Sequence, residues 1–232
     1  MTPAVDPQVS LAFDYPYLWP KASYVLDGGQ LHAFERSLRH GRIPILAIGS
    51  NRAPSQLGRK FGVDACVVVE KVWLEDYDIV YAARLSRYGA VPATLLASPG
   101  VSVEVAMTWL TSEQVEIMHR TEGVGRSYDV VKIRPSCLPG AELSTDVAAY
   151  SASAGALFLD HQFWPLAAVA STGRATQAYE SSEILEKVCA YLDAGTETAD
   201  FVRRVQTEPV FRQACLSHLK VVGRRVRRPT DA

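Results

Sequence analysis

Two short segments of the sequence carry residue types that can bind anions and transfer protons. The first is Gly49-Ser50-Asn51, which directly follows an apolar run from Pro44 to Ile48. Such a run predicts a buried strand, so the triplet is expected in a tight loop at the end of that strand. Converging backbone N–H groups at a turn of this kind can bind a carboxylate or stabilise an oxyanion. An ordinary polar turn has the same composition, and the triplet alone leaves both interpretations open.

The second segment contains Glu122, which lies between a predicted helix and two glycines, Gly123 and Gly125. A carboxylate at a helix C-terminus is not stabilised by the helix dipole, which favours cations there. Residues whose placement opposes the stability of the fold are candidates for function. Glu122 is therefore a candidate acid/base group, with a solvated surface acid as the alternative.

The elements that must position these segments are predicted from caps and periodicity. Thr111 to Gln114 has the pattern of a capping box, which predicts a helix of about two turns ending near Glu122. Strands are expected at 92–97, 102–110 and 127–134, and two more in 65–84, joined by a turn at Glu75-Asp76. The spacing of Leu31, Phe34 and Leu38 predicts a short helix after Asp27.

The chain divides into four predicted parts. Residues 1–26 combine aromatic residues with four prolines, which favours an extended arm. Residues 27–175 form the main domain, although its apolar runs 154–159 and 163–170 are compatible with strands or with buried helix. Helical periodicity predicts a helical extension over 176–222 that packs on the domain. Residues 223–232 are expected to be a solvated, disordered basic tail.

The composition limits the classes of partner. The chain has 232 residues, is 48% hydrophobic and has a net charge of −1, from 24 basic and 25 acidic side chains. This balance gives no reason to expect nucleic acid or membrane as a partner and favours a small neutral or zwitterionic molecule. The four cysteines have no metal-ligand spacing, so reduced thiols without a metal are expected. The N-terminal segment lacks the pattern of a signal peptide, which makes a cytoplasmic protein the expectation.

Three segments together resemble the γ-glutamyl cyclotransferase-like family of the AIG2-like superfamily. They are ILAIGSN at 45–51, VPATLLASPGVSVEV at 91–105 and LTSEQVEIMHRTEGVGRSYDVVKI at 110–133. Their order and spacing are similar to those of a family pattern, in which a strand ends in YGSN and a helix leads to a glutamate followed by a tyrosine. The resemblance covers roughly residues 43–135, and TEGVGRSY is its most specific piece.

The resemblance implies an α+β fold, a compact, partly closed β-barrel with flanking helices and a cavity at its mouth. It also implies that Glu122 is the general acid/base and that the loop at Gly49, Ser50 and Asn51 holds the substrate. Ile48 and Tyr128 are further candidates for the cavity wall, although Tyr128 is equally compatible with an ordinary strand aromatic. The implied reaction is intramolecular aminolysis of a γ-glutamyl amide, a transferase or lyase type of reaction that releases 5-oxoproline and needs no cofactor.

The chain departs from the family pattern at two positions. Ile48 replaces the tyrosine of YGSN, which implies either another donor, with Tyr88, Arg87 and Arg126 as candidates, or a different substrate. Val105 replaces a glycine, and its side chain would either narrow the cavity or fill the core. These departures support an alternative function, a non-catalytic binding module that keeps the cavity. The extra terminal segments are compatible with a reshaped cavity mouth or with a homodimer.

A third hypothesis makes Ser50 the nucleophile of a hydrolase. The sequence around it, Ile-Gly-Ser-Asn-Arg, lacks the G-x-S-x-G elbow that exposes such a serine. His119 does not supply a base by itself, because a lone histidine near a helix end is usually a surface or capping residue. This hypothesis is the least supported of the three.

Overall fold

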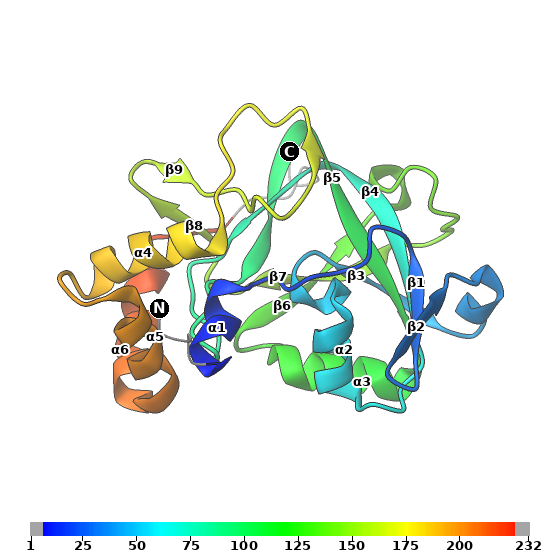
Figure 1. The fold of residues 1–232 in the computed structure, drawn as a ribbon. Coiled ribbons are helices and arrows are strands. Elements are labelled where there is room, and N and C mark those ends of the chain that lie inside the picture. Colours follow the sequence, from blue (N-terminus) through cyan, green and yellow to red (C-terminus); the bar gives the residue numbers. More distant parts are fainter. Residues whose placement is uncertain (1–6, 226–232) are drawn as a thin grey trace.

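The computed structural model describes residues 7–225 and has an α+β fold built on one large sheet (Figure 1). The strand order in this sheet is β2-β1-β4-β5-β3-β7-β6, and β10 pairs with β5. The strands are β1 (Tyr24–Asp27), β2 (Gln30–Ala33), β3 (Ile43–Ala47), β4 (Val67–Tyr81), β5 (Ala93–Leu110), β6 (Tyr128–Ile133), β7 (Val147–Ala152) and β10 (Ser171–Thr172). The α+β class is thereby confirmed. Within the described residues β2 and β6 do not pair, so the sheet stays open and does not close as a barrel.

A smaller sheet and the helices complete the fold. The smaller sheet has the order β11-β8-β9 and consists of β8 (Ala156–Leu159), β9 (Gln162–Phe163) and β11 (Gly223–Arg224). The helices are α1 (Pro7–Phe13), α2 (Pro54–Phe61), α3 (Ser112–Glu122), α4 (Ser181–Leu192), α5 (Thr198–Thr207) and α6 (Pro209–Val221), with short 3-10 turns η1 (Arg36–Arg39), η2 (Ser50–Arg52) and η3 (Pro135–Cys137). In the described part of the chain, no helix is long and apolar enough to cross a membrane.

Strand β3 places the predicted loop at one edge of the sheet. It pairs antiparallel with β5 and parallel with β7, and its residues 45–47 are buried. Since β3 and β7 are parallel, their C-terminal ends lie at the same edge. Tyr128 opens β6 opposite Ala152, the last residue of β7, so the start of β6 lies at this edge too. The topology therefore brings the 49–51 loop and Tyr128 together.

Helices α2 and α3 lie side by side under the sheet (Figure 1). Leu57 of α2 and Met118 of α3 are fully buried in one apolar cluster, which joins both helices to the sheet. The capping box is confirmed, because the Thr111 hydroxyl accepts a hydrogen bond from the Gln114 amide at 3.3 Å and the Gln114 side chain accepts one from Thr111 at 3.0 Å. The helix is longer than the two turns predicted, and it ends at Glu122.

Two sequence predictions near the start of the sheet were wrong. Asp27 does not begin a helix: Gly28 and Gly29, with φ values of 54° and 73°, form the turn of a hairpin in which Asp27 pairs with Gln30. Two glycines with positive φ suit the two-residue turns that match the twist of paired strands. Glu75-Asp76 does not end a strand either. Asp76 has a φ of 62° at an irregularity within the single long strand β4, where the partner in β5 changes from Ser102 for Glu75 to Ala97 for Tyr77. The pairing continues on both sides of this shift, so the strand does not end there.

The terminal segments differ in part from the predictions. Residues 7–13 are helical rather than extended, and Val9 and Ala12, three residues apart on one face of α1, are fully buried. The C-terminal segment is helical as predicted, and α4, α5 and α6 gather at one end of the molecule beside α1 (Figure 1). The expected basic tail begins differently, because Gly223 and Arg224 pair with β8. Its residues 226–232 lie outside the described residues.

The structure also shows the conformation of the two apolar runs, 154–159 and 163–170, which were compatible with strand or with buried helix. Residues 156–159 of the first run form strand β8, which the C-terminal strand β11 covers. The second run starts at the end of β9 and then continues without regular secondary structure. Val105 is fully buried in the main apolar cluster, so this side chain fills the core.

Candidate active site

One cavity of about 500 Å³ gathers every residue that the sequence analysis assigned to the site. These residues are Ile48, Gly49, Ser50, Asn51, Glu122 and Tyr128. They come from the end of β3, the turn η2, the end of α3 and the start of β6. The three alternative donors Tyr88, Arg87 and Arg126 line the same cavity, whereas Val105 does not. The predicted acid and the predicted loop therefore meet at one hollow of the molecule.

The carboxylate of Glu122 is oriented by two donors. Asn51 Nδ2 donates to Glu122 Oε1 at 3.0 Å, and the ammonium of Lys60, in the last turn of α2, forms an ion pair with the same oxygen. The side chains of Lys60 and Glu122 are only 6% and 14% exposed. Among the described residues, Oε2 of Glu122 has no hydrogen-bond partner. One carboxylate oxygen is thus fixed by the protein, and the other remains for a ligand.

The side chain of Asn51 has a buried acceptor without a partner among the described residues. With its Nδ2 directed at Glu122, its Oδ1 is buried and has no hydrogen-bond partner within residues 7–225. A buried acceptor without a partner is unfavourable, because it has lost its hydrogen bonds to water. The hydrogen bond to Glu122 is therefore made at the expense of this acceptor, which is closed to solvent.

Arg52 anchors the loop through contacts outside the lining of the cavity. Its guanidinium is buried, donates to the carbonyl oxygen of Ala168 at 2.8 Å and lies 4.4 Å from the ring centre of Trp19. Burial is the main reason why the pKa of Arg52 falls to about 10. The Tyr24 hydroxyl donates to the Arg52 carbonyl oxygen at 2.7 Å. These contacts hold the 49–52 turn in place, so its backbone donors are preorganised.

Tyr15 supplies a hydroxyl that the sequence analysis did not foresee. Its oxygen accepts a hydrogen bond from the Ala93 amide at 2.8 Å and lies 2.2 Å from where a Cβ on Gly49 would be. Burial raises the pKa of Tyr15 far above its usual range, so this side chain is a neutral O–H group at neutral pH. The described residues include no acceptor for its proton. Tyr15 therefore brings a hydroxyl against the loop where Ile48 has none.

The contact between Tyr15 and Gly49 gives a first prediction. In Gly49→Ala, the new methyl group must push the Tyr15 hydroxyl away from the loop, because the two cannot occupy the same space. Displacements of about 1 Å in a reacting site cost about 10²-fold in rate, so for a reaction at this cavity, such as the one proposed below, we expect a loss of that size in kcat/KM. The matched control is Gly58→Ala in α2, where nothing lies within 4 Å of the added Cβ.

The control variant has its own expected result. Alanine is the better helix former, so Gly58→Ala should raise the free energy of unfolding by about 0.5–1 kcal/mol and leave kcat/KM unchanged. Steady-state kinetics and urea unfolding of both variants measure the difference. Equal activity of Gly49→Ala and the parent chain would show that the Tyr15–Gly49 contact has no part in turnover.

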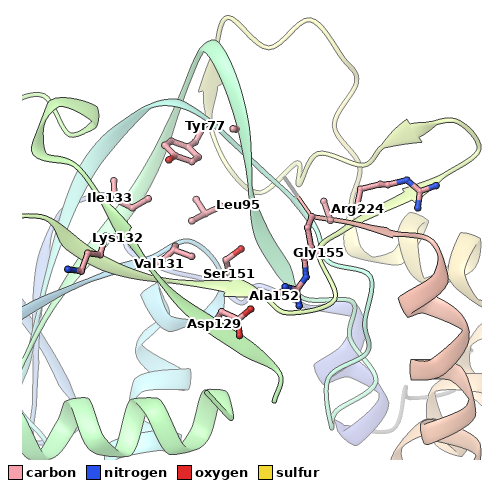
Figure 2. Close-up of a pocket in the computed structure, with 13 residues that line it drawn as sticks. Tyr77, Leu95, Asp129, Val131, Lys132, Ile133, Ser151, Ala152, Gly155 and Arg224 are labelled. Atoms are coloured by element: carbon pink, nitrogen blue, oxygen red, sulfur yellow. The ribbon is translucent and has the colours of Figure 1, made fainter. Parts of the chain in front are cut away.

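A second, smaller cavity of about 200 Å³ lies on the other face of the β6–β7 pair (Figure 2). Side chains alternate between the faces of a strand, so Tyr128 and Tyr150 face the large cavity while Asp129 and Ser151 face the small one. Leu95 and other apolar side chains form part of the wall of the small cavity. Asp129 is the only carboxylate among its lining residues, and it accepts a hydrogen bond from Ser153 at 2.9 Å. Asp129 is exposed and is held by this one neutral donor, whereas Glu122 of the large cavity is mostly buried and is held by an amide and an ammonium.

Comparison with known proteins finds structural likeness alone. No protein-family model and no curated protein sequence matches the chain. It is similar to a solved structure described as gamma-glutamyl cyclotransferase, with a TM-score of 0.40 and 11% identity over 82% of this chain and 95% of that one. It is also similar to an uncharacterized protein from Homo sapiens, with a TM-score of 0.42 and 12% identity over 83% and 97% of the two chains. Because these values are low, the function is inferred from the cavity of this chain.

Proposed function

We propose that this chain catalyses the intramolecular aminolysis of a γ-glutamyl amide, with Glu122 as the general acid/base. The observation that carries the proposal is the contact between Glu122 and Asn51 at 3.0 Å, at a cavity large enough for a small molecule. The family resemblance of the segments around both residues supports the same reaction. The products are 5-oxoproline and a free amine or amino acid.

The reaction needs one base that later acts as an acid. The α-amino group of the substrate is an ammonium at neutral pH and must lose a proton before it can attack. Glu122 Oε2 accepts that proton, the amine nitrogen bonds to the γ-carbonyl carbon, and the ring closes. The attacking nitrogen gives up its second proton, which is transferred to the leaving nitrogen as the original amide C–N bond breaks and the carbonyl re-forms. Glu122 then passes the first proton to the released amine, which leaves as an ammonium. No water is consumed, and the carboxylate is regenerated.

Neighbouring groups favour this sequence of steps. The Nδ2 of Asn51 holds Oε1 of Glu122, which leaves Oε2 to receive the proton of the attacking amine. The amides of Gly49, Ser50 and Asn51 and the Tyr15 hydroxyl are donors for the developing oxyanion or for the α-carboxylate of the substrate. Tyr128 would close the wall beside them.

The Tyr15 hydroxyl gives a second prediction. If it donates to the substrate, Tyr15→Phe should lower kcat/KM by about 10-fold to 10²-fold, since a hydrogen bond to a charged group is lost. The Ala93 amide also loses its acceptor, so unfolding should become easier by about 1–3 kcal/mol. Tyr17→Phe is the control, because Tyr17 lines the same cavity and its ring, which packs on Arg59, stays in place. A Tyr15→Phe chain with parental kcat/KM would assign Tyr15 a structural role only.

The Lys60–Glu122 ion pair is the observation that favours the alternative, a binding module without turnover. The ammonium of Lys60 already neutralises the carboxylate that would have to receive the substrate's ammonium, so ligand binding by the other cavity groups would remain while the chemistry is lost. Ser50 as a nucleophile has less support still. Among the described residues Ser50 has no hydrogen bond to a histidine, and Nδ1 of His119 bonds the Tyr150 hydroxyl at 2.8 Å instead.

One assay separates these functions. The chain is incubated with γ-glutamyl peptides and γ-glutamyl amines, and 5-oxoproline, glutamate and remaining substrate are quantified by mass spectrometry. Formation of 5-oxoproline supports the proposal. A compound that raises Tm and is recovered unaltered supports the binding module, and glutamate without 5-oxoproline supports hydrolysis.

A further inference from the structure

Tyr15 belongs to a segment that lies outside the sheet. It follows helix α1, and its hydroxyl reaches the loop of the candidate site, where it accepts the hydrogen bond from the Ala93 amide and lies against Gly49. Terminal segments are poorly ordered unless contacts with the rest of the domain tie them down. The contacts of this segment therefore decide where the Tyr15 hydroxyl lies.

The C-terminal helices provide the first of these contacts. Helix α1 packs on α4 and α5, and its residues Val9 and Ala12 belong to the same buried apolar cluster as Ile184 of α4 and Val202 of α5. This packing fastens α1, which ends two residues before Tyr15. Apolar packing is not directional, so it does not by itself fix the orientation of the backbone that follows the helix.

Ser181, the first residue of α4, supplies a directional contact. Its hydroxyl donates to the carbonyl oxygen of Tyr15 at 2.6 Å, between residues that are 166 positions apart in the sequence. Both residues are buried, and a carbonyl oxygen can only accept, so the single hydroxyl proton of Ser181 is used for Tyr15. A hydrogen bond fixes direction as well as distance, and this one orients the Tyr15 backbone.

Ser181 also completes a closed set of contacts. Its oxygen lies 3.2 Å from the hydroxyl of Tyr81, the last residue of β4, and Tyr81 pairs with Ala93 in the sheet. Ala93 donates to the Tyr15 hydroxyl, and the Tyr15 carbonyl oxygen accepts from Ser181. Tyr15 and Ala93 line the large cavity, whereas Tyr81 and Ser181 do not. Tyr15 is therefore held at both its hydroxyl and its backbone, and the backbone contact comes from outside the cavity.

We infer that Ser181 is a positioning residue of the active site, because its hydrogen bond to the Tyr15 carbonyl oxygen sets the place of the Tyr15 hydroxyl at the 49–51 loop. The effect of this bond on a rate rests on the proposed function, whereas its effect on the place of the hydroxyl does not. No residue of α4, α5 or α6 lines the large cavity. The C-terminal helices thus contribute to the site through Tyr15 and without touching a substrate.

A double-mutant cycle of Ser181→Ala with Tyr15→Phe tests the inference in the full chain. In the parent background, Ser181→Ala should lower kcat/KM for a γ-glutamyl amide by about tenfold, because small displacements in a reacting site are costly. In the Tyr15→Phe background there is no hydroxyl to misplace, and the same substitution should change kcat/KM by less than about twofold. An equal loss in both backgrounds would overturn the inference, as would parental kcat/KM in the single variant Ser181→Ala.

The neighbouring serine provides the matched control. Ser182 lies in the same first turn of α4, is half-buried, and its side chain has no hydrogen bond within residues 7–225. Ser182→Ala should therefore keep the kcat/KM of each background. Ser181→Cys has a side chain of similar size with only a weak donor, and it replaces Ser181→Ala, with the same expected results, if that chain does not fold.

The Ala93 amide reports the place of the Tyr15 hydroxyl without any turnover. Its ¹H–¹⁵N resonance is recorded in the full chain, and Tyr15→Phe gives the direction of the shift when the acceptor is lost. Ser181→Ala should move this resonance in the same direction, whereas Ser182→Ala should leave it in place.

This measurement separates the inference from the proposed function. A moved Ala93 resonance in Ser181→Ala, together with no 5-oxoproline from any γ-glutamyl compound, would support positioning by Ser181 and reject the proposed reaction. Formation of 5-oxoproline by the parent chain, with the resonance and kcat/KM both unchanged in Ser181→Ala, would support the reaction and overturn the inference.

Discussion

Glu122→Gln is expected to lower kcat for the conversion of a γ-glutamyl amide to 5-oxoproline by about 10²- to 10⁴-fold. The amide keeps the size of the side chain and still accepts a hydrogen bond from Lys60, but it cannot take a proton from the attacking ammonium. KM should change much less, because the groups that hold the substrate are untouched. Steady-state kinetics with quantified 5-oxoproline provides the measurement.

The matched control is Glu116→Gln, which changes an exposed glutamate on the same helix. It should leave kcat and KM as they are in the parent chain. Because Glu122→Gln leaves the ammonium of Lys60 without a counter-ion, its Tm is recorded too, and the double variant with Lys60→Met removes both charges if the single variant is unstable. A folded Glu122→Gln chain with more than half of the parental kcat would contradict the role of Glu122.

The second large effect concerns stability. Asp78→Ala should lower the free energy of unfolding by about 3–5 kcal/mol, because Arg174 would be left buried without a counter-charge. Arg174 donates to Oδ1 of Asp78 at 2.6 Å and to Oδ2 at 2.9 Å. The side chains of Arg174 and Asp78 are only 8% and 5% exposed. This pair fastens the segment after β10 to strand β4.

Urea unfolding measures the loss, and two comparisons interpret it. Asp78→Leu with Arg174→Met removes both charges and should cost less than Asp78→Ala, since no unpaired charge remains buried. Asp200→Ala breaks an ion pair with Arg203 whose side chains are about half exposed, and it should cost less than about 1 kcal/mol. If Asp78→Ala cost no more than Asp200→Ala, the buried pair would have no special part in holding the fold together.

Local patterns predicted those parts of the fold that depend on near neighbours in the chain. The capping box at Thr111 and the end of α3 at Glu122 were predicted, because the residues that form each of them lie within a few positions. The hairpin at Gly28-Gly29 was missed, because the apolar residues Leu31, Phe34 and Leu38 have helical spacing and this pattern was given more weight than the two glycines before them. The single strand β4 was missed because an irregularity within a strand and a turn between strands have similar composition.

The site residues also differ in whether a local pattern in the sequence could predict them. Glu122 and the 49–51 loop were predicted from motifs, and the structure places them at one cavity. Lys60 and Tyr15 were not predicted, because they reach the site only through the packing of α2 on α3 and of the N-terminal segment on the sheet. Neither contact has a pattern in the sequence near Glu122.

The net charge of the chain does not report how charge is distributed at the cavity. A balance of 24 basic and 25 acidic side chains favoured a neutral or zwitterionic partner. That sum is insensitive to where the charges lie, and six basic side chains meet at the cavity from four separate stretches of the chain. Local charge, which only the fold reveals, determines what a cavity can attract.

The fate of solvent oxygen tests the central claim most directly. The parent chain is incubated with a γ-glutamyl amide in water enriched in ¹⁸O, and the ¹⁸O content of the products is measured by mass spectrometry. Attack by the substrate's own amine predicts 5-oxoproline without ¹⁸O, released together with an equal amount of free amine. Glutamate that carries one ¹⁸O would show that water attacked the carbonyl carbon, and it would contradict the aminolysis assigned to Glu122.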